Sequence, residues 1–232
     1  MQKRHWTMLA AFLVILAAWP MTAAAQSEQP WFVMTFRPEV AAGFGNMTLE
    51  WDSFGGLLDY KEEAAIESVS AWGLTPEAFF MPTSGRHFII SATGMFGGGN
   101  GRFEEEAGEV IDGEDLRFSY WHLAVGLGGQ WFLGAAERTN LYLMAHLGGG
   151  RMRFSVDYED EDATSDPLGA GYFDATIGST YRFASNFVLG GSLALANQRF
   201  AGTADSGDFW NVNTSGSLLT TKLSLVLGFA VF

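Results

Sequence analysis

The closing stretch of the sequence, residues 216–232 (GSLLTTKLSLVLGFAVF), alternates between two kinds of side chain. In an extended chain, one face would carry Leu219, Thr221, Leu223, Leu225, Leu227, Phe229 and Val231. The other face would carry Thr220, Lys222, Ser224, Val226, Gly228 and Ala230. This period of two predicts a β-strand. Its apolar face is long enough to cross a bilayer as a tilted strand, which takes about 9–11 residues.

The chain ends on an aromatic residue, Phe232. A final Phe after an amphipathic last strand resembles the C-terminal signature of bacterial outer-membrane β-barrel proteins. The resemblance implies that Leu225, Leu227, Phe229 and Phe232 form a signal for the barrel assembly machinery. Phe232 lies on the opposite parity from the other three.

The first 25 residues have the order of parts that is typical of a secretory signal peptide. Lys3 and Arg4 are followed by an apolar run over 8–19 and by the small residues Ala23-Ala24-Ala25. We therefore expect a cleaved signal peptide over 1–25 and a single mature domain over 26–232. An uncleaved N-terminal membrane helix is the less favoured alternative, since the apolar run is short and ends at Pro20.

Composition favours lipid rather than disulfides as the source of stability. The chain has no cysteine, so an exported form has no disulfide to stabilise it. Hydrophobic residues make up 48% of the chain, yet beyond the signal peptide no run is long enough for a membrane helix. Alternating apolar strands enter a bilayer only as a closed barrel, because open backbone groups are too costly in hydrocarbon.

The acidic charge argues against nucleic-acid binding, which needs a basic surface. The net charge is −13, and it becomes −15 once Lys3 and Arg4 leave with the signal peptide. No DNA or RNA partner is expected.

Period-two patterns predict eight strands in the mature chain, at about residues 31–43, 67–80, 87–100, 116–133, 141–156, 171–183, 187–200 and 216–232. We expect a loop with a helical turn or two over 44–66, where the sequence DYKEEAAIESV has helical propensity. In the fifth strand the apolar parity inverts after Gly148-Gly149-Gly150, which predicts a β-bulge at the glycines.

The connections alternate between short turns of low charge and longer acidic segments. Short periplasmic turns, longer external loops and an even strand number are typical of outer-membrane barrels. Over its mature length, the pattern resembles the OmpA/OmpX-like family of eight-stranded barrels. The resemblance implies an all-β, antiparallel, up-and-down transmembrane β-barrel in the outer membrane of a Gram-negative cell.

An eight-stranded barrel has an interior just wide enough to be filled by side chains. The parities place three acids and three bases inward, which predicts a paired lumen network, since unpaired buried charges are costly. Its members are Arg37, Glu39, Glu77, Asp174, Arg182 and Lys222. An open channel lined by charge is the alternative to this filled interior.

No catalytic, cofactor or metal site is expected. Ser119 and His122 are three residues apart and so face opposite sides of one strand. A lipid-modifying enzyme would need a His–Ser pair between strands, and such a pair stays open. The acidic stretch 157–166 lacks the glycine of an EF-hand turn, so we expect a solvated face there. Weak collective attraction of Ca²⁺ or Mg²⁺ is the alternative.

These features predict a non-enzymatic outer-membrane barrel with a structural or surface-interaction role, exerted through its acidic external loops. The expected partners are outer-membrane lipid, lipopolysaccharide, the barrel assembly machinery and an external molecule bound by the loops. A small passage for apolar solutes and a lipid A-modifying enzyme are the alternatives.

Overall fold

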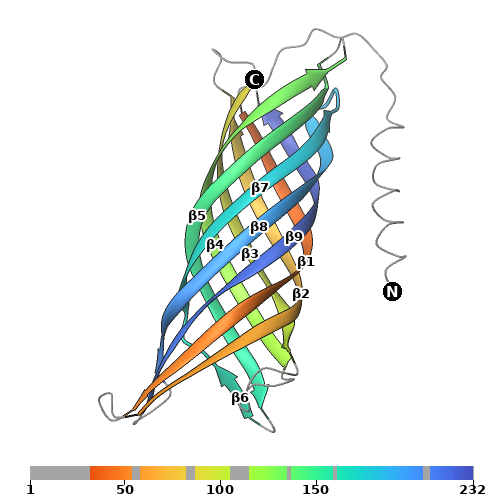
Figure 1. Cartoon of the computed structure of the whole chain (residues 1–232). Coiled ribbons are helices and arrows are strands. Elements are labelled where there is room, and N and C mark those ends of the chain that lie inside the picture. Colours follow the sequence, from red (N-terminus) through yellow and green to blue (C-terminus); the bar gives the residue numbers. More distant parts are fainter. Residues whose placement is uncertain are drawn as a thin grey trace.

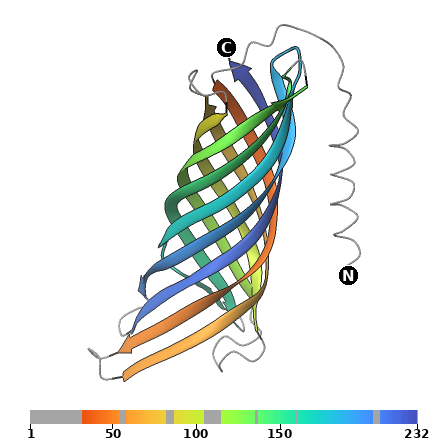
Figure 2. The ribbon, with the colours of Figure 1, turned by 45° about the horizontal axis from the view of Figure 1, so that its top comes forward.

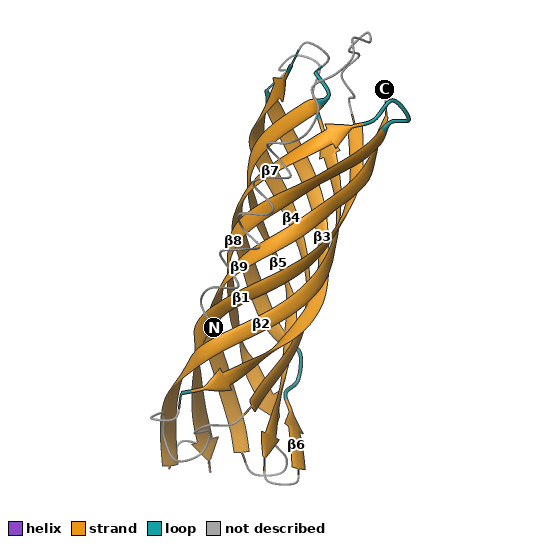
Figure 3. Ribbon diagram, turned by 90° about the vertical axis from the view of Figure 1, so that its right-hand side faces the viewer, coloured by secondary structure: helices purple, strands orange, loops and turns teal. Residues whose placement is uncertain are grey.

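The computed structural model describes residues 32–53, 58–81, 87–104, 115–134, 137–158, 161–205 and 210–231. Within them, eight long antiparallel strands form a ring and one short strand extends a hairpin (Figure 1). Figure 3 shows that the described chain consists of strands and the turns between them. The strands are β1 (Phe32–Ser53), β2 (Leu58–Phe80), β3 (Phe88–Phe103), β4 (Asp115–Leu133), β5 (Thr139–Tyr158), β6 (Glu161–Thr164), β7 (Leu168–Arg182), β8 (Phe187–Asp205) and β9 (Trp210–Val231).

The ring closes between the first and last strands. β1 pairs with β9 from Phe32 opposite Val231 to Ser53 opposite Trp210. Every other long strand pairs with its neighbours in chain order, and β6 pairs with the end of β5, from Ser155 opposite Thr164 onward. The predicted eight-stranded, all-β, up-and-down barrel is therefore confirmed.

The two ends of the barrel differ in their connections. We call the end that carries Phe32, Val231 and the turn at residues 183–186 the turn end, at the top of Figure 1. Asn186 adopts a left-handed φ of 63°, which Asn tolerates better than most residues and which makes this turn tight. The opposite, loop end carries the β1–β2, β5–β6 and β8–β9 hairpins. There β1 and β2 project beyond the rest of the wall (Figure 2).

An apolar belt surrounds the barrel on its outer face. On β4 the outward side chains from Trp121 to Trp131 include Leu123, Val125 and Leu127, which are 57–65% exposed. The ten residue steps from Trp121 to Trp131 span about 33 Å of strand, or about 23 Å along the axis at a tilt of about 45°. That height matches the apolar band of about 25 Å on transmembrane barrels. Other members of the belt are Phe36, Val40, Phe44, Trp72, Leu74, Phe96, Leu143, Leu147, Phe173, Ile177, Leu195, Leu225 and Phe229.

The loop predicted over 44–66 is wrong. β1 continues to Ser53 and β2 starts at Leu58, and the two pair there, with Met47 opposite Ala64. Ile66 is buried and Lys61 and Glu63 are exposed, as a strand alternation requires. Helix propensity is a weak preference. Here the ladder with β1 and the burial of one face outweigh it.

The bulge predicted at Gly148-Gly149-Gly150 is also wrong. β5 keeps one register with β4 and with β7 through the glycines, with His122 opposite Gly150 and Gly148 opposite Tyr172. Met152 and Phe154 accordingly point into the barrel and are buried. The direction of successive side chains therefore does not change at the glycines. What changes is which face is apolar, because the strand leaves the apolar belt at this point.

Candidate functional site

A layer of buried charged groups crosses the lumen in the middle of the barrel. Its members come from five of the eight long strands, and each lies on the inward parity of its strand. All are at most 7% exposed: Arg37 and Glu39 from β1, Glu77 from β2, His146 from β5, Asp174 from β7 and Lys222 from β9. We call this set the charged layer. It contains five of the six residues that the sequence predicts for a lumen network.

One half of the charged layer is a chain of four groups. Arg37 Nη2 lies 3.1 Å from Glu77 Oε2. The other oxygen of that carboxylate, Oε1, lies 2.8 Å from His146 Nε2, and His146 Nδ1 lies 2.7 Å from Asp174 Oδ1. Asp174 also accepts hydrogen bonds from the hydroxyls of Thr176 and Tyr172. Two carboxylates are therefore held between cations and hydroxyl donors.

The other half is built around Glu39. Lys222 Nζ donates to Glu39 Oε1 at 2.8 Å, and Thr75 Oγ1 donates to Glu39 Oε2 at 3.2 Å. The ammonium group also lies over two aromatic rings, 5.1 Å from the centroid of Tyr172 and 5.8 Å from that of Tyr120. The ion pair and the rings together compensate for removing Lys222 from water.

His146 is the member of the charged layer that sequence reasoning did not assign to it. Both ring nitrogens face carboxylates, which only accept hydrogen bonds when ionised. With Glu77 and Asp174 ionised, both nitrogens must carry a hydrogen, and His146 is the third cation. The inward parity of His146 was readable from the sequence, but its two carboxylate partners lie 28 and 69 residues away in the chain.

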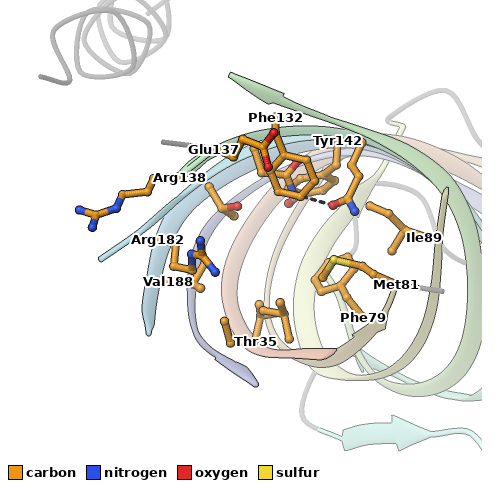
Figure 4. Close-up of a pocket in the computed structure, with 15 residues that line it drawn as sticks. Thr35, Phe79, Met81, Ile89, Phe132, Glu137, Arg138, Tyr142, Arg182 and Val188 are labelled. Atoms are coloured by element: carbon orange, nitrogen blue, oxygen red, sulfur yellow. Dashed lines mark hydrogen bonds between the residues drawn. The ribbon is translucent and has the colours of Figure 1, made fainter. Parts of the chain in front are cut away.

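The expected third cation, Arg182, lies elsewhere. It is half-buried at the last position of β7, and its backbone N–H donates to Arg138 O at 2.9 Å across the turn end. There it lines a cavity of about 40 Å³. Figure 4 shows Phe79 and Met81 across the cavity from Arg182, while the side chain of Arg138 extends away from it.

Ser91, His146 and Asp174 lie in the order of the serine, histidine and aspartate of a catalytic triad. His146 Nε2 lies 3.1 Å from Ser91 Oγ, so a His–Ser pair between strands does exist. The same nitrogen lies closer to Glu77, at 2.8 Å. A nitrogen that donates to a carboxylate does not accept the serine proton, as a general base must. All three residues are at most 2% exposed and point into the lumen, on the inner side of the barrel wall.

Two apolar clusters enclose the charged layer along the barrel axis. Toward the turn end lie Val33, Phe79, Met81, Ile89, Tyr142, Met144, Val188 and Ala230. Toward the loop end lies a larger cluster that includes Met47, Ile66, Met95, Phe103, Leu116, Phe118, Met152, Phe154, Leu168, Phe200 and Leu218. The rings of Phe154 and Phe200 pack with centroids 4.5 Å apart. We call these clusters the turn-end plug and the loop-end plug.

The residues of the predicted C-terminal assembly signal lie on the closing strand. Leu225 and Phe229 point outward, 48% and 60% exposed, and Leu227 lies on the same parity and is partly exposed. Phe232 lies outside the described residues.

Within the described ranges, no group of three His, Cys, Asp or Glu side chains is arranged to hold a metal ion. No helix in those same ranges has the length and apolarity needed to cross a membrane.

Comparison with known proteins supports the architecture. No family model matches the sequence, and no curated protein matches it. Several solved structures do match it. The outer membrane protein OprG from Pseudomonas aeruginosa aligns over 90% of this chain and 100% of its own, at 10% identity and a TM-score of 0.50. AlkL, solved in DMPC lipid bilayers, aligns over 92% and 96% at 16% identity and a TM-score of 0.42. Neisserial surface protein A aligns over 82% and 95% at 13% identity and a TM-score of 0.33. At this identity the likeness to OprG concerns the fold, and this chain accordingly has the architecture of an eight-stranded outer-membrane barrel.

Proposed function

We propose that this protein is a non-enzymatic outer-membrane barrel that acts as a structural or surface-interaction element, with its loop end outside the cell. The observation that carries the proposal is the closed lumen. A charge-balanced layer with three cations and three carboxylates lies between two apolar plugs. A conducting pore needs a continuous hydrated path. The turn-end plug lines a small cavity, but the charged layer and the larger loop-end plug argue against a path through the whole barrel.

The two alternative functions find less support. An apolar solute that passed along the axis would have to cross the charged layer, where it has no favourable partner. A lipid-modifying enzyme needs its nucleophile at the membrane rim, whereas Ser91 is buried beside Glu77 and His146. The work of such a barrel therefore falls to its outer surface and loops.

Electrical recording tests the closed lumen. The mature protein is folded into lipid vesicles, its folding is verified by heat-dependent mobility in gels, and the vesicles are fused with a planar bilayer. We expect no stepwise conductance. Reproducible single-channel steps from folded protein would contradict the proposal, and so would uptake of an apolar dye into vesicles that depends on the barrel.

Export and location need a separate test, because the predicted signal peptide lies outside the described residues. We expect the protein in the outer-membrane fraction, with Gln26 as its first residue. An intact N-terminus in the inner membrane would contradict both parts. We also propose outer-membrane lipid, lipopolysaccharide and the barrel assembly machinery as its partners, together with an external molecule bound by the loops.

A further inference from the structure

The cations of this acidic chain are gathered in a few places. Two, Arg37 and Lys222, belong to the charged layer in the lumen. On the outer face, five exposed arginines and one exposed lysine lie in the loop-end half of the strands, beyond the apolar belt: Lys61, Arg102, Arg117, Arg151, Arg153 and Arg199. The chain as a whole has a net charge of −13, so this local concentration of cations does not reflect its average composition. Four of the six lie on β4, β5 and β8, around the same side of the wall.

The pairing register shows how near they are to each other and to the belt. Arg151 lies opposite Trp121, the last belt residue of β4, and Arg153 lies opposite Ser119. Arg117 is the diagonal neighbour of Arg153, since it pairs with Ser155. Opposite residues are about 5 Å apart and diagonal ones about 7–8 Å. Three guanidinium groups thus project from one small area at the edge of the belt.

The fourth arginine faces this area across β7. Arg151 lies opposite Gly169, and Gly171 lies opposite Arg199. Both glycines point outward, and a Cβ added to them would meet nothing closer than 3.5 Å and 3.9 Å. A strip without side chains therefore runs between the arginines of β5 and the arginine of β8. We call Arg151, Arg153 and Arg199 the arginine patch.

The position and chemistry of the arginine patch fit one occupant. Guanidinium groups bind phosphate through paired, charge-assisted hydrogen bonds. The patch begins where the belt ends, at the depth at which lipid phosphates lie when the belt is in hydrocarbon. Below it, Leu123, Leu147 and Phe173 are 49–67% exposed and offer contact for acyl chains. Along the barrel axis, the arginines thus lie level with the phosphate headgroup of a phospholipid or glycolipid, and the belt lies level with its acyl chains.

Carboxylates are also present in this zone. Among residues whose side chains the structure describes on β3 to β8, Asp115 and Asp166 are exposed there. Asp115 lies opposite Arg102 in the register and two residues from Arg117 on the same face of β4, so we leave Arg102 and Arg117 outside the patch.

We propose that the arginine patch binds the phosphorylated headgroup of a lipid in the outer leaflet. This inference rests on the proposed function, since it requires the barrel to lie in the outer membrane with its loop end outside.

The test measures how much lipid stays on the folded protein. Bisphosphorylated lipid A is added in detergent, and bound lipid is counted by native mass spectrometry. The variant Arg151→Gln/Arg199→Gln removes two charges from the patch and keeps side-chain size. The matched control, Lys61→Gln/Arg138→Gln, removes two charges from elsewhere. Because the variant removes charge-assisted hydrogen bonds to phosphate, we expect it to bind at least about tenfold more weakly and the control to match wild type.

Two further measurements identify the source of the phosphate. Monophosphorylated lipid A should bind more weakly than the bisphosphorylated form to wild type, and this difference should vanish in the patch variant. Excess inorganic phosphate should not displace the lipid, because its acyl chains hold it to the belt.

Equal binding by the patch variant and wild type overturns the inference, and so does an equal loss in the control. Displacement by inorganic phosphate shows an anion site without lipid and overturns it as well. Failure of the wild type to fold into lipid would contradict the proposed function instead. Folded protein without a preference for phosphorylated lipid would contradict only this inference.

Discussion

Along β5, the residues from Leu141 to Leu147 and those from Arg151 to Ser155 alternate in the same sense but with opposite chemistry. In the first stretch Leu143 and Leu147 point outward, and His146 points into the lumen. In the second, Arg151 and Arg153 point outward, and Met152 points inward. The pleat fixes the direction of each side chain, and the medium outside the barrel determines which chemistry is favourable there. The barrel is thus a membrane protein in its belt and resembles a water-soluble β-barrel at its loop end.

The two zones are stabilised by different interactions. In the belt, lipid covers the apolar face, and the interior is held by ion pairs whose members would be costly if left alone. At the loop end, water covers charged side chains, and the loop-end plug provides a packed core. Substitutions that look alike should therefore have different effects in the two zones.

Glu77→Ala should have the largest effect, because it leaves Arg37 and His146 buried without their shared carboxylate. Removing one partner of a buried ion pair costs about 3–5 kcal/mol. The control is Glu63→Ala, on the same strand but exposed, where Lys61 Nζ lies 2.6 Å from Glu63 Oε1 at the surface. Urea unfolding from lipid vesicles should separate the two variants clearly. Equal stabilities would mean that water reaches the charged layer.

Met152→Ala should destabilise the loop-end plug. Met152 is 1% exposed, and truncating a buried Met costs about 2–5 kcal/mol. The control is Arg153→Ala at the neighbouring position, whose free energy of unfolding should stay within about 0.5 kcal/mol of wild type. The chain has no cysteine, so Met152→Cys and Arg153→Cys can also be compared by labelling with a thiol reagent. Faster labelling of Met152→Cys than of Arg153→Cys would show that Met152 faces outward, as the predicted bulge at Gly148-Gly149-Gly150 requires.

Leu225→Arg tests the belt. Leu225 lies midway between Leu219 and Val231 on the outer face of β9, and an arginine at the bilayer midplane costs about 2–4 kcal/mol. Ser215→Arg, outward on the same strand but in the loop-end zone, should cost about 0–1 kcal/mol. Folding yield into vesicles measures both. A similar loss for the two would mean that the belt reaches farther toward the loop end than its side chains indicate.

Arg182→Ala should have the smallest effect, about 1 kcal/mol or less, as for an ion pair near the surface. Arg182 lies at the turn end, outside the charged layer, so its loss leaves no lumen carboxylate unpaired. Urea unfolding beside Arg37→Ala measures the contrast. A loss as large as that of Arg37→Ala would show that Arg182 supports the network after all.

The local pattern of the sequence contains much of the fold. The alternation in the closing stretch and in residues 116–133 is long and regular enough to predict strands and their outward faces, and both are confirmed. The same parity put Arg37, Glu39, Glu77, Asp174 and Lys222 inside. The prediction failed where alternation alone was ambiguous. In 44–66, acidic residues and alanines favoured a helix, and only pairing with β1 makes the segment a strand.

What the sequence determined by itself is therefore the set of side chains on each face, because a strand sends successive side chains to opposite sides whatever surrounds it. The tertiary structure decided which of them meet. It brought His146 between Glu77 and Asp174, left Arg182 at the turn end, and set Arg151 and Arg199 on either side of two glycines. These neighbours depend on register and on closure of the ring, which are set by contacts among all eight long strands at once. It also decided the height of Met152 along the barrel, where water rather than lipid lies outside, so that at this level the apolar side chains are the inward ones.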